Sequence, residues 1–292
     1  MKPGAFEYRR ATSIQEALST LAVDGEDVRV LAGGQSLIPM MNMRMARPSL
    51  LVDIGAVAEL DDLRVVDGML RVGAMTRQAT LEHSETAVAA CPLAVAATTW
   101  IGHRQIRSRG TVGGTIAHAD PAAELPTAAV ALGAEMVIRS SDGERVCAAA
   151  NFFEGFFGTA VQPSELLTEV RFPTWGRHAA FSEISRRHGD FAIIGVGAAL
   201  DLGSDGRVRQ AGIALAGVGP APIKASAAEQ LLVGRNPTDD AIREAALAAV
   251  DVATPTSDIH GSAAFRTHLV RVLTIDALAR ALASSPSQEV PA

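Results

Sequence analysis

The residues with the clearest chemical potential form a glycine turn between a predicted strand and a predicted helix. Residues 28–31 are a short apolar strand, and a helical pattern runs over residues 37–45. Between them stands the segment Ala32-Gly33-Gly34-Gln35-Ser36. Glycines let a backbone approach an anion closely, and free N–H groups at the start of a helix bind phosphate. The turn therefore predicts a phosphate site, to which Gln35 and Ser36 add side-chain donors; a tight turn without a ligand is the alternative.

A second glycine pair occurs in Thr111-Val112-Gly113-Gly114-Thr115, within a predicted loop over residues 100–117. The same loop carries Arg104, Arg107 and Arg109, whose positive charge suits an anion. Two separate glycine turns are compatible with a ligand that contains a pyrophosphate. Neither turn matches G-x-G-x-x-G, so the sequence does not indicate a dinucleotide-binding Rossmann fold. For the arginines, the alternative is a solvated basic loop.

The remaining polar residues predict binding rather than catalysis. His118, Asp120 and Glu124 lie close together in the sequence, but their spacing is not H-E-x-x-H, and the sequence offers no matching second cluster. A metal site is therefore disfavoured. Glu124 is better interpreted as an acceptor for ligand hydroxyl groups. Because no Ser-His-Asp or Cys-His set can be assembled from the order of the residues, we expect no catalytic side chain and no metal in this chain.

Composition excludes several other classes of protein. The chain has 292 residues and a formal charge of -6, which argues against a basic surface that binds nucleic acid. Its two cysteines, Cys91 and Cys147, cannot build a four-thiolate iron–sulfur cluster and are typical of a reduced, cytoplasmic protein. The most apolar stretch, residues 191–200, is about half as long as a transmembrane helix. We therefore expect a cytoplasmic protein without membrane insertion.

The elements that must position these residues predict an α+β fold with two domains. Residues 1–176 form the first predicted domain, with a strand–turn–helix–strand subdomain (1–57) and a hairpin-rich subdomain (58–176). Turn residues at 173–176 separate it from a second domain, 177–292, with a three-stranded antiparallel sheet and helices. The main expected elements are hairpins at 63–72 and 134–147, a helix at 87–97 that is interrupted near Pro92, a helix at 126–132, strands at 181–187, 191–202 and 208–218, and helices at 225–232, 238–250 and 263–282.

The two glycine turns together resemble the flavin motifs of the FAD-binding medium subunits of molybdenum hydroxylases. The first motif reads A-G-G-Q-S-L-I-P-M-M over residues 32–41, and the second combines T-V-G-G-T (111–115) with D-P-A-A-E-L-P (120–126). The likeness extends to residues 186–192 and 258–266 and covers essentially the whole chain. This superfamily includes carbon monoxide dehydrogenases, nicotine and nicotinate dehydrogenases, and the flavin segment of xanthine dehydrogenase. The resemblance implies a vanillyl-alcohol-oxidase/PCMH-like FAD-binding domain followed by a smaller domain.

The resemblance also implies which residues would bind FAD. Residues 32–36, with the adjoining Leu37, and residues 111–115 would wrap the pyrophosphate and adenosine part. Glu124 matches an acidic position that binds the ribityl chain, and Ile101 and Leu167 would line the cofactor. Phe191 matches an aromatic residue, frequently Tyr, beside the isoalloxazine ring. The full predicted set is Ala32, Gly33, Gly34, Gln35, Ser36, Leu37, Ile101, Thr111, Gly113, Gly114, Thr115, Glu124, Leu167 and Phe191.

This chain departs from the family pattern at three of these positions. Phe191 lacks the hydroxyl group of Tyr and with it any phenol hydrogen bond. Thr115 stands where Asn is common, so that a shorter hydroxyl replaces an amide near the phosphates. Gln35 replaces a His that is frequent in carbon monoxide dehydrogenase relatives, which favours a substrate other than carbon monoxide.

Finally, the resemblance implies a division of labour between subunits. A large molybdopterin subunit would oxidise the substrate, a small subunit with [2Fe-2S] clusters would relay electrons, and this chain would pass them from FAD to an external acceptor. The assembly would be a dimer of heterotrimers. The alternatives are a stand-alone FAD-dependent oxidoreductase with its own organic substrate and a flavin-free scaffold. In the hydroxylase subunit and in the stand-alone oxidoreductase, the redox chemistry belongs to the cofactor, and the protein binds and orients it.

Overall fold

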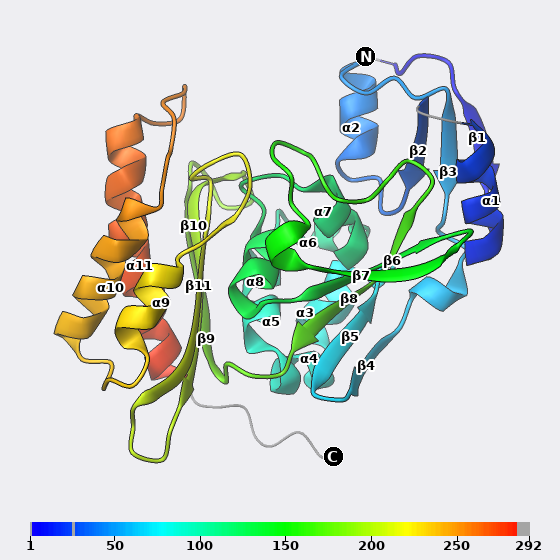
Figure 1. Cartoon of the computed structure of the whole chain (residues 1–292). Helices are drawn as coiled ribbons and strands as arrows, with labels where there is room; N and C mark the ends of the chain where they lie inside the picture. The colour runs from blue at the N-terminus through cyan, green and yellow to red at the C-terminus, as the bar shows by residue number, and fades with distance from the viewer. Residues whose placement is uncertain (1, 25–26, 285–292) are drawn as a thin grey trace.

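Residues 2–24 and 27–284 are described by a computed structural model, in which they form three β-sheets with helices between and outside them (Figure 1). The ends of the predicted domains at residues 1 and 292 lie outside the described residues. The N-terminal sheet, called here the parallel sheet, has the order β1–β3–β2 and consists of β1 (Glu7–Arg10), β2 (Val28–Leu31) and β3 (Leu50–Asp53). Both pairings are parallel. The other two sheets, described below, are antiparallel, and the combination of these sheets with helices confirms the predicted α+β class.

The helices of the parallel sheet follow local sequence signals. Helix α1 (Ile14–Asp24) begins where the Ser13 hydroxyl accepts a hydrogen bond from the Glu16 N–H group. The Glu16 carboxylate in turn accepts one from the Thr12 N–H group at 2.8 Å, so the helix start has a capping box whose return bond is displaced by one residue. Helix α2 (Leu37–Asn42) follows the first glycine turn but is shorter than the predicted 37–45. Arg44, with φ of 61°, ends the helical geometry.

A second sheet, called the central sheet, has the order β4–β5–β8–β6–β7 and is antiparallel throughout. Both predicted hairpins are present. The first joins β4 (Leu63–Val66) to β5 (Met69–Gly73) through Asp67 and Gly68, which both have positive φ, as a two-residue hairpin turn requires. The second joins β6 (Glu135–Ser140) to β7 (Gly143–Ala148). Strand β8 (Leu166–Pro173) lies between the hairpins.

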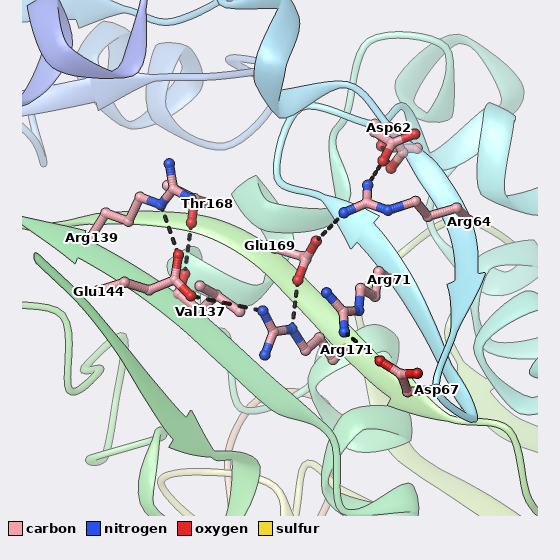
Figure 2. A network of polar contacts seen from close by, with 11 residues as sticks. Asp62, Arg64, Asp67, Arg71, Val137, Arg139, Glu144, Thr168, Glu169 and Arg171 are labelled. Carbon is pink, nitrogen blue, oxygen red and sulfur yellow. Dashed lines mark hydrogen bonds and ion pairs between the residues drawn. The ribbon is translucent and has the colours of Figure 1, made fainter.

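One face of the central sheet carries a ladder of ion pairs that crosses the strands (Figure 2). Glu169 on β8 accepts from Arg171 at 2.5 Å and pairs with Arg64 on β4 at 3.4 Å. Glu144 on β7 pairs with Arg139 on β6 at 2.9 Å and with Arg171 at 3.8 Å. Each glutamate therefore contacts two arginines, and such an array of paired charges suits a solvated face. The other face of the sheet is apolar and packs against helices.

Those helices lie between β5 and β6 in the chain. They are α3 (Gln78–His83), α4 (Glu85–Ala90), α5 (Pro92–Trp100), α6 (Arg104–Arg107), α7 (Val112–His118) and α8 (Glu124–Leu132). The helix predicted over 87–97 divides near Pro92, as expected, because Pro92 cannot continue α4 but suits the first turn of α5. The loop predicted over 100–117 was also wrong, since α6 and most of α7 lie within it.

The C-terminal sheet has the order β12–β11–β10–β9 and is antiparallel. It consists of β9 (His178–Ser185), β10 (Ala192–Leu202), β11 (Val208–Ala216) and β12 (Ile223–Lys224). The expected three strands are present, but the expected strand count was wrong, because the two-residue β12 adds a further strand at the edge. Helices α9 (Ser226–Leu232), α10 (Asp239–Asp251) and α11 (Ala263–Ala283) cover one face, as Figure 1 shows.

Helix α8 joins the two larger sheets. All of its residues are buried. It packs against β10 and β11 on one side and against β8 of the central sheet on the other. The approach to β11 is close: a Cβ atom on Gly212 would lie 2.3 Å from the Ala131 carbonyl oxygen. The C-terminal sheet is therefore packed directly onto α8, the helix that begins at Glu124.

Candidate functional site

A cleft of about 800 Å³ opens between the parallel sheet, helices α7 and α8, and the loop before β10. It is lined by every residue predicted to bind the cofactor: Ala32, Gly33, Gly34, Gln35, Ser36, Leu37, Ile101, Thr111, Gly113, Gly114, Thr115, Glu124, Leu167 and Phe191. These residues come from distant parts of the chain, and the fold brings them to one surface. Their role as cofactor ligands is a separate question, which the geometry below addresses.

The two glycine turns lie against each other at the floor of this cleft. A Cβ atom on Gly33 would lie 2.4 Å from the Arg109 carbonyl oxygen and 2.9 Å from the Gly110 Cα atom. A Cβ atom on Gly114 would lie 3.6 Å from the Ala32 side chain. Gly34 has a φ of +73°, which glycine adopts readily. The absence of side chains thus allows the first turn to pack on the backbone that leads into the second.

The second turn leads directly into helix α7. The Thr111 hydroxyl caps this helix by accepting a hydrogen bond from the Gly114 N–H group at 3.1 Å. Gly113 approaches the chain after β5 so closely that a Cβ atom would lie 2.4 Å from the Ala74 Cβ atom. The N–H groups of Gly113 and Thr115 donate to the Ala74 and Thr111 carbonyl groups, so residues 113–115 line the cleft without a free backbone donor.

Gln78, at the start of α3, is a cleft residue that the sequence analysis missed. Its side chain is 2% exposed, and its Nε2 atom donates to the Thr115 hydroxyl at 2.6 Å. Its Oε1 atom is buried and has no hydrogen-bond partner within the described part of the chain. Gln78 therefore holds Thr115 in place at the cleft. A lone Gln in a helix belongs to no motif, so no sequence signal could have identified it.

The predicted arginine cluster does not contribute to the cleft in the expected way. Arg107 is bound to Glu82 through two hydrogen bonds of 2.7 and 2.9 Å, and it also donates to the Ile101 carbonyl group. Arg107 therefore fixes the loop instead of facing a ligand. Neither it nor Arg104 or Arg109 lines the cleft, whereas Arg29 and Arg47 do.

Acidic residues and a histidine form the opposite end of the cleft. Glu124 is 8% exposed at the start of α8, and burial, with a smaller contribution from repulsion by Asp120, raises the pKa of its carboxyl to about 7. His118 lies on Phe157 with ring centroids 5.1 Å apart, and burial lowers the pKa of its imidazole. No group of three potential metal ligands occurs in residues 2–24 and 27–284. This end is thus suited to hydrogen bonding with neutral hydroxyl groups.

Apolar residues complete the walls. Ile101 and Leu167 are buried beside the cleft, whereas Phe191 is 76% exposed at its mouth. The loop before Phe191 is anchored on the first domain, since a Cβ atom on Gly189 would lie 2.4 Å from the His103 ring. The described residues therefore combine a glycine-lined floor, a carboxylate and apolar walls, which fits the phosphates, the ribityl chain and the ring system of FAD.

This fold and this cleft define a flavoprotein class, and comparison with known protein families agrees. Residues 4–175 match the family of the FAD binding domain in molybdopterin dehydrogenase. Residues 179–281 match the CO dehydrogenase flavoprotein C-terminal domain. The chain belongs to this family, as the two glycine turns predicted.

Individual relatives span the full length of the chain. The 6-hydroxypseudooxynicotine dehydrogenase complex subunit alpha of Paenarthrobacter nicotinovorans is 42% identical, covering 97% of this chain and 96% of the relative. Caffeine dehydrogenase subunit beta of Pseudomonas sp. (strain CBB1) is also 42% identical, covering 96% of each. Carbon monoxide dehydrogenase from Hydrogenophaga pseudoflava has a TM-score of 0.93 at 36% identity, over 97% of this chain and 99% of that one. Quinoline 2-oxidoreductase from Pseudomonas putida 86 has a TM-score of 0.91 at 37% identity, over 96% and 98%.

Proposed function

We propose that this chain is the FAD-binding electron-transfer subunit of a multi-subunit molybdenum hydroxylase. The observation that carries the proposal is the cleft, because it gathers both glycine turns, Glu124 and three apolar residues at one surface in a chain of this family. The proposal assigns FAD binding to residues 1–176 and a smaller supporting domain to residues 177–292. It also assigns roles in FAD binding to the glycine turns and to several side chains of the cleft, as follows.

The backbone N–H groups of the first glycine turn would bind the pyrophosphate, with the Gln35 and Ser36 side chains as further donors. The second turn, whose N–H groups donate within the protein, would form the surface on which the ligand lies. The Glu124 carboxylate would accept hydrogen bonds from ribityl hydroxyl groups. Ile101, Leu167 and Phe191 would contact the ring system. Bound FAD supplies the chemistry that joins one-electron and two-electron transfer, and the protein binds and orients it and limits its contact with water.

Partner subunits follow from what this chain lacks. Cys91 is buried, and the two cysteines of the chain are fewer than the four thiolates that an iron–sulfur cluster needs. Iron–sulfur clusters and molybdopterin would therefore belong to a small and a large subunit, in a dimer of heterotrimers. The relatives named "complex subunit alpha" and "medium chain" belong to multi-subunit enzymes. We place the complex in the cytoplasm; for the described residues, no helix is both long and apolar enough to cross a membrane.

The substrate would bind in the large subunit, so this chain does not determine it. The names of two relatives point to nitrogen heterocycles or their derivatives, namely 6-hydroxypseudooxynicotine and caffeine. We favour a substrate of this class over carbon monoxide because Gln35 stands at the position where carbon monoxide dehydrogenase relatives frequently have His.

The test is to purify the complex through a tag on this chain, record its absorbance spectrum and identify the subunits that co-purify. Flavin bands with an iron–sulfur shoulder and two further subunits are expected. Flavin bands on a lone chain that an organic substrate bleaches would instead establish a stand-alone oxidoreductase. A colourless chain that shows no thermal shift with FAD would establish a flavin-free scaffold.

A further inference from the structure

The amide side chain of Gln78 is a buried polar group that the stability of the fold does not explain. Gln78 is 2% exposed, and in residues 2–24 and 27–284 its Oε1 atom has no hydrogen-bond partner. A buried acceptor without a donor costs free energy, which an apolar side chain of similar size would avoid. The Gln78 side chain therefore requires a role other than stabilising the chain.

The backbone already joins the start of α3 to the second glycine turn without this side chain. The Gln78 N–H group donates to the Gly110 carbonyl group at 3.0 Å. On the other side of the contact, the Val112 N–H group donates to the Thr76 carbonyl group at 2.9 Å. These backbone bonds hold the two segments together, so the Gln78 amide is not needed to place the turn.

The amide instead fixes the hydroxyl group of Thr115. The Gln78 Nε2 atom donates to the Thr115 Oγ1 atom at 2.6 Å. The Thr115 hydroxyl in turn donates its proton to the Thr111 carbonyl oxygen, one helical turn earlier, at 3.2 Å. A hydroxyl group has one proton and two lone pairs. The proton and one lone pair of Thr115 are therefore used within the protein, and one lone pair remains.

Rotation of either group leaves this result unchanged. If the Thr115 proton turned away from Thr111, the two oxygen atoms would face each other with lone pairs only, which is repulsive. If the Gln78 amide turned to present Oε1, that oxygen would accept the same proton. In either case the proton stays inside the protein, so the Thr115 hydroxyl can offer a ligand an acceptor but no donor.

The backbone around Thr115 offers no donor to a ligand either. The N–H groups of residues 113–115 donate within the protein, as described above. Phosphate oxygens are acceptors and need donors, whereas sugar hydroxyl groups can donate. This part of the second glycine turn is thus unsuited to phosphate and suited to a ligand hydroxyl group.

We propose that Thr115 accepts a hydrogen bond from a ribose or ribityl hydroxyl group of FAD and that Gln78 is the residue that positions it. Both residues line the cleft, and Thr115 is half-buried there. This inference rests on the proposed function of the cleft. It assigns the second glycine turn to a sugar part of the ligand and leaves the pyrophosphate to the first turn.

The role of the hydroxyl group is tested by the Kd of the FAD-free full chain for FAD, measured by flavin fluorescence. Thr115→Val removes the hydroxyl and should raise the Kd about tenfold, the size of one hydrogen bond. Thr115→Ser keeps the hydroxyl and should bind like the wild type. Equal affinity in Thr115→Val and the wild type would overturn the proposal.

The role of Gln78 is tested in the same assay. Gln78→Leu leaves the hydroxyl less well oriented and should raise the Kd about threefold, without lowering the melting temperature of the FAD-free chain. Combined with Thr115→Val, it should add no further loss, because Gln78 acts through the hydroxyl. Additive losses in the double variant, or wild-type affinity in Gln78→Leu, would overturn the positioning role.

FAD analogues that each lack one ribityl or ribose hydroxyl group identify the group that Thr115 binds. With the analogue that lacks this group, the wild type and Thr115→Val should have equal Kd values. With FAD and the other analogues, the tenfold difference should remain. A difference that persists with every analogue would show that Thr115 binds another part of the ligand, such as a phosphate, and would overturn the proposal.

Thr274 on α11 provides a matched control. Its hydroxyl also donates to the carbonyl group one turn earlier, that of Val270, at 2.7 Å, and Thr274 does not line the cleft. Thr274→Val should leave the Kd for FAD unchanged. If the wild type binds no FAD, the proposed function fails. If the wild type binds FAD and Thr115→Val binds it equally well, only the assignment of Thr115 and Gln78 fails.

Discussion

Replacing Gly33 with Ala is the most direct test of the glycine-lined floor. The new Cβ atom would lie 2.4 Å from the Arg109 carbonyl oxygen and 2.9 Å from the Gly110 Cα atom. Both obstacles are backbone atoms, so no side chain can rotate away. Ordinary contact begins at 3.4 Å, so the two turns must separate by about 1 Å.

A separation of this size should affect binding more than folding. Overpacking of this kind costs about 1–3 kcal/mol of unfolding free energy, which a domain of this size tolerates. A displacement of about 1 Å in a preorganised site typically costs about a hundredfold, and we expect the Kd for FAD to rise by this factor. At an FAD concentration of 100 times the wild-type Kd, the wild type gains about 2.7 kcal/mol of stability, whereas Gly33→Ala should gain only about 0.4 kcal/mol.

The assay compares unfolding of each protein with and without FAD, together with titration of flavin fluorescence. Gly197→Ala is the matched control, because Gly197 lies on β10 of the C-terminal sheet, outside the residues that line the cleft, and its Cβ atom would make only ordinary contacts, the nearest at 3.5 Å. That variant should bind FAD like the wild type. Wild-type affinity in Gly33→Ala would refute the assignment of the first glycine turn.

Three further predictions concern the side chains around the cleft. Glu124→Ala should raise the Kd for FAD by about tenfold, because a change of this size corresponds to the loss of one hydrogen bond. An unchanged FAD titration would show that Glu124 does not belong to the site. The free energy of unfolding should fall as the pH rises from about 5 to about 8, because the raised pKa values of Glu124 and Glu183 make the folded chain bind more protons than the unfolded chain in this window. Urea unfolding at several pH values in this window measures the change, and a free energy of unfolding that rises with pH would contradict the prediction. Arg107→Met should lower the free energy of unfolding by about 3 kcal/mol, because it leaves the Glu82 side chain, which is 14% exposed, without its partner. A loss below about 1 kcal/mol in urea unfolding would show that the ion pair contributes no more than a solvent-exposed pair.

The site could be predicted from the sequence because its chemistry is carried by local motifs. The first turn stands between β2 and α2, and the second turn leads into α7, so each glycine pair is recognisable within a few residues. The cleft-lining position of Leu167 and Phe191 came from resemblance to a family, since a buried strand residue and an exposed aromatic residue carry no local signal of their own.

The missed features depend on contacts between distant segments. Strand β1 has the sequence EYRR and is exposed along its length, so no alternation marks it, and only its backbone pairing with β3 makes it a strand. Gln78 acquires its role from Thr115, across 37 positions of the chain. Glu183 lies in a predicted strand, but a charged residue on a buried face contradicts the usual pattern, and its burial arises from packing of helices against β9.

These long-range contacts change how the C-terminal domain should be understood. It contributes Gly189, Asp190 and Phe191 to the cleft, and it holds the loop before Glu124 through the Gly217–Pro121 hydrogen bond. Helix α8 begins at the cleft and ends against β11, with all of its residues buried. A buried helix of this kind cannot shift at one end without repacking at the other. The C-terminal sheet is therefore a structural wall of the flavin site, and changes on either side of α8 should be felt at both.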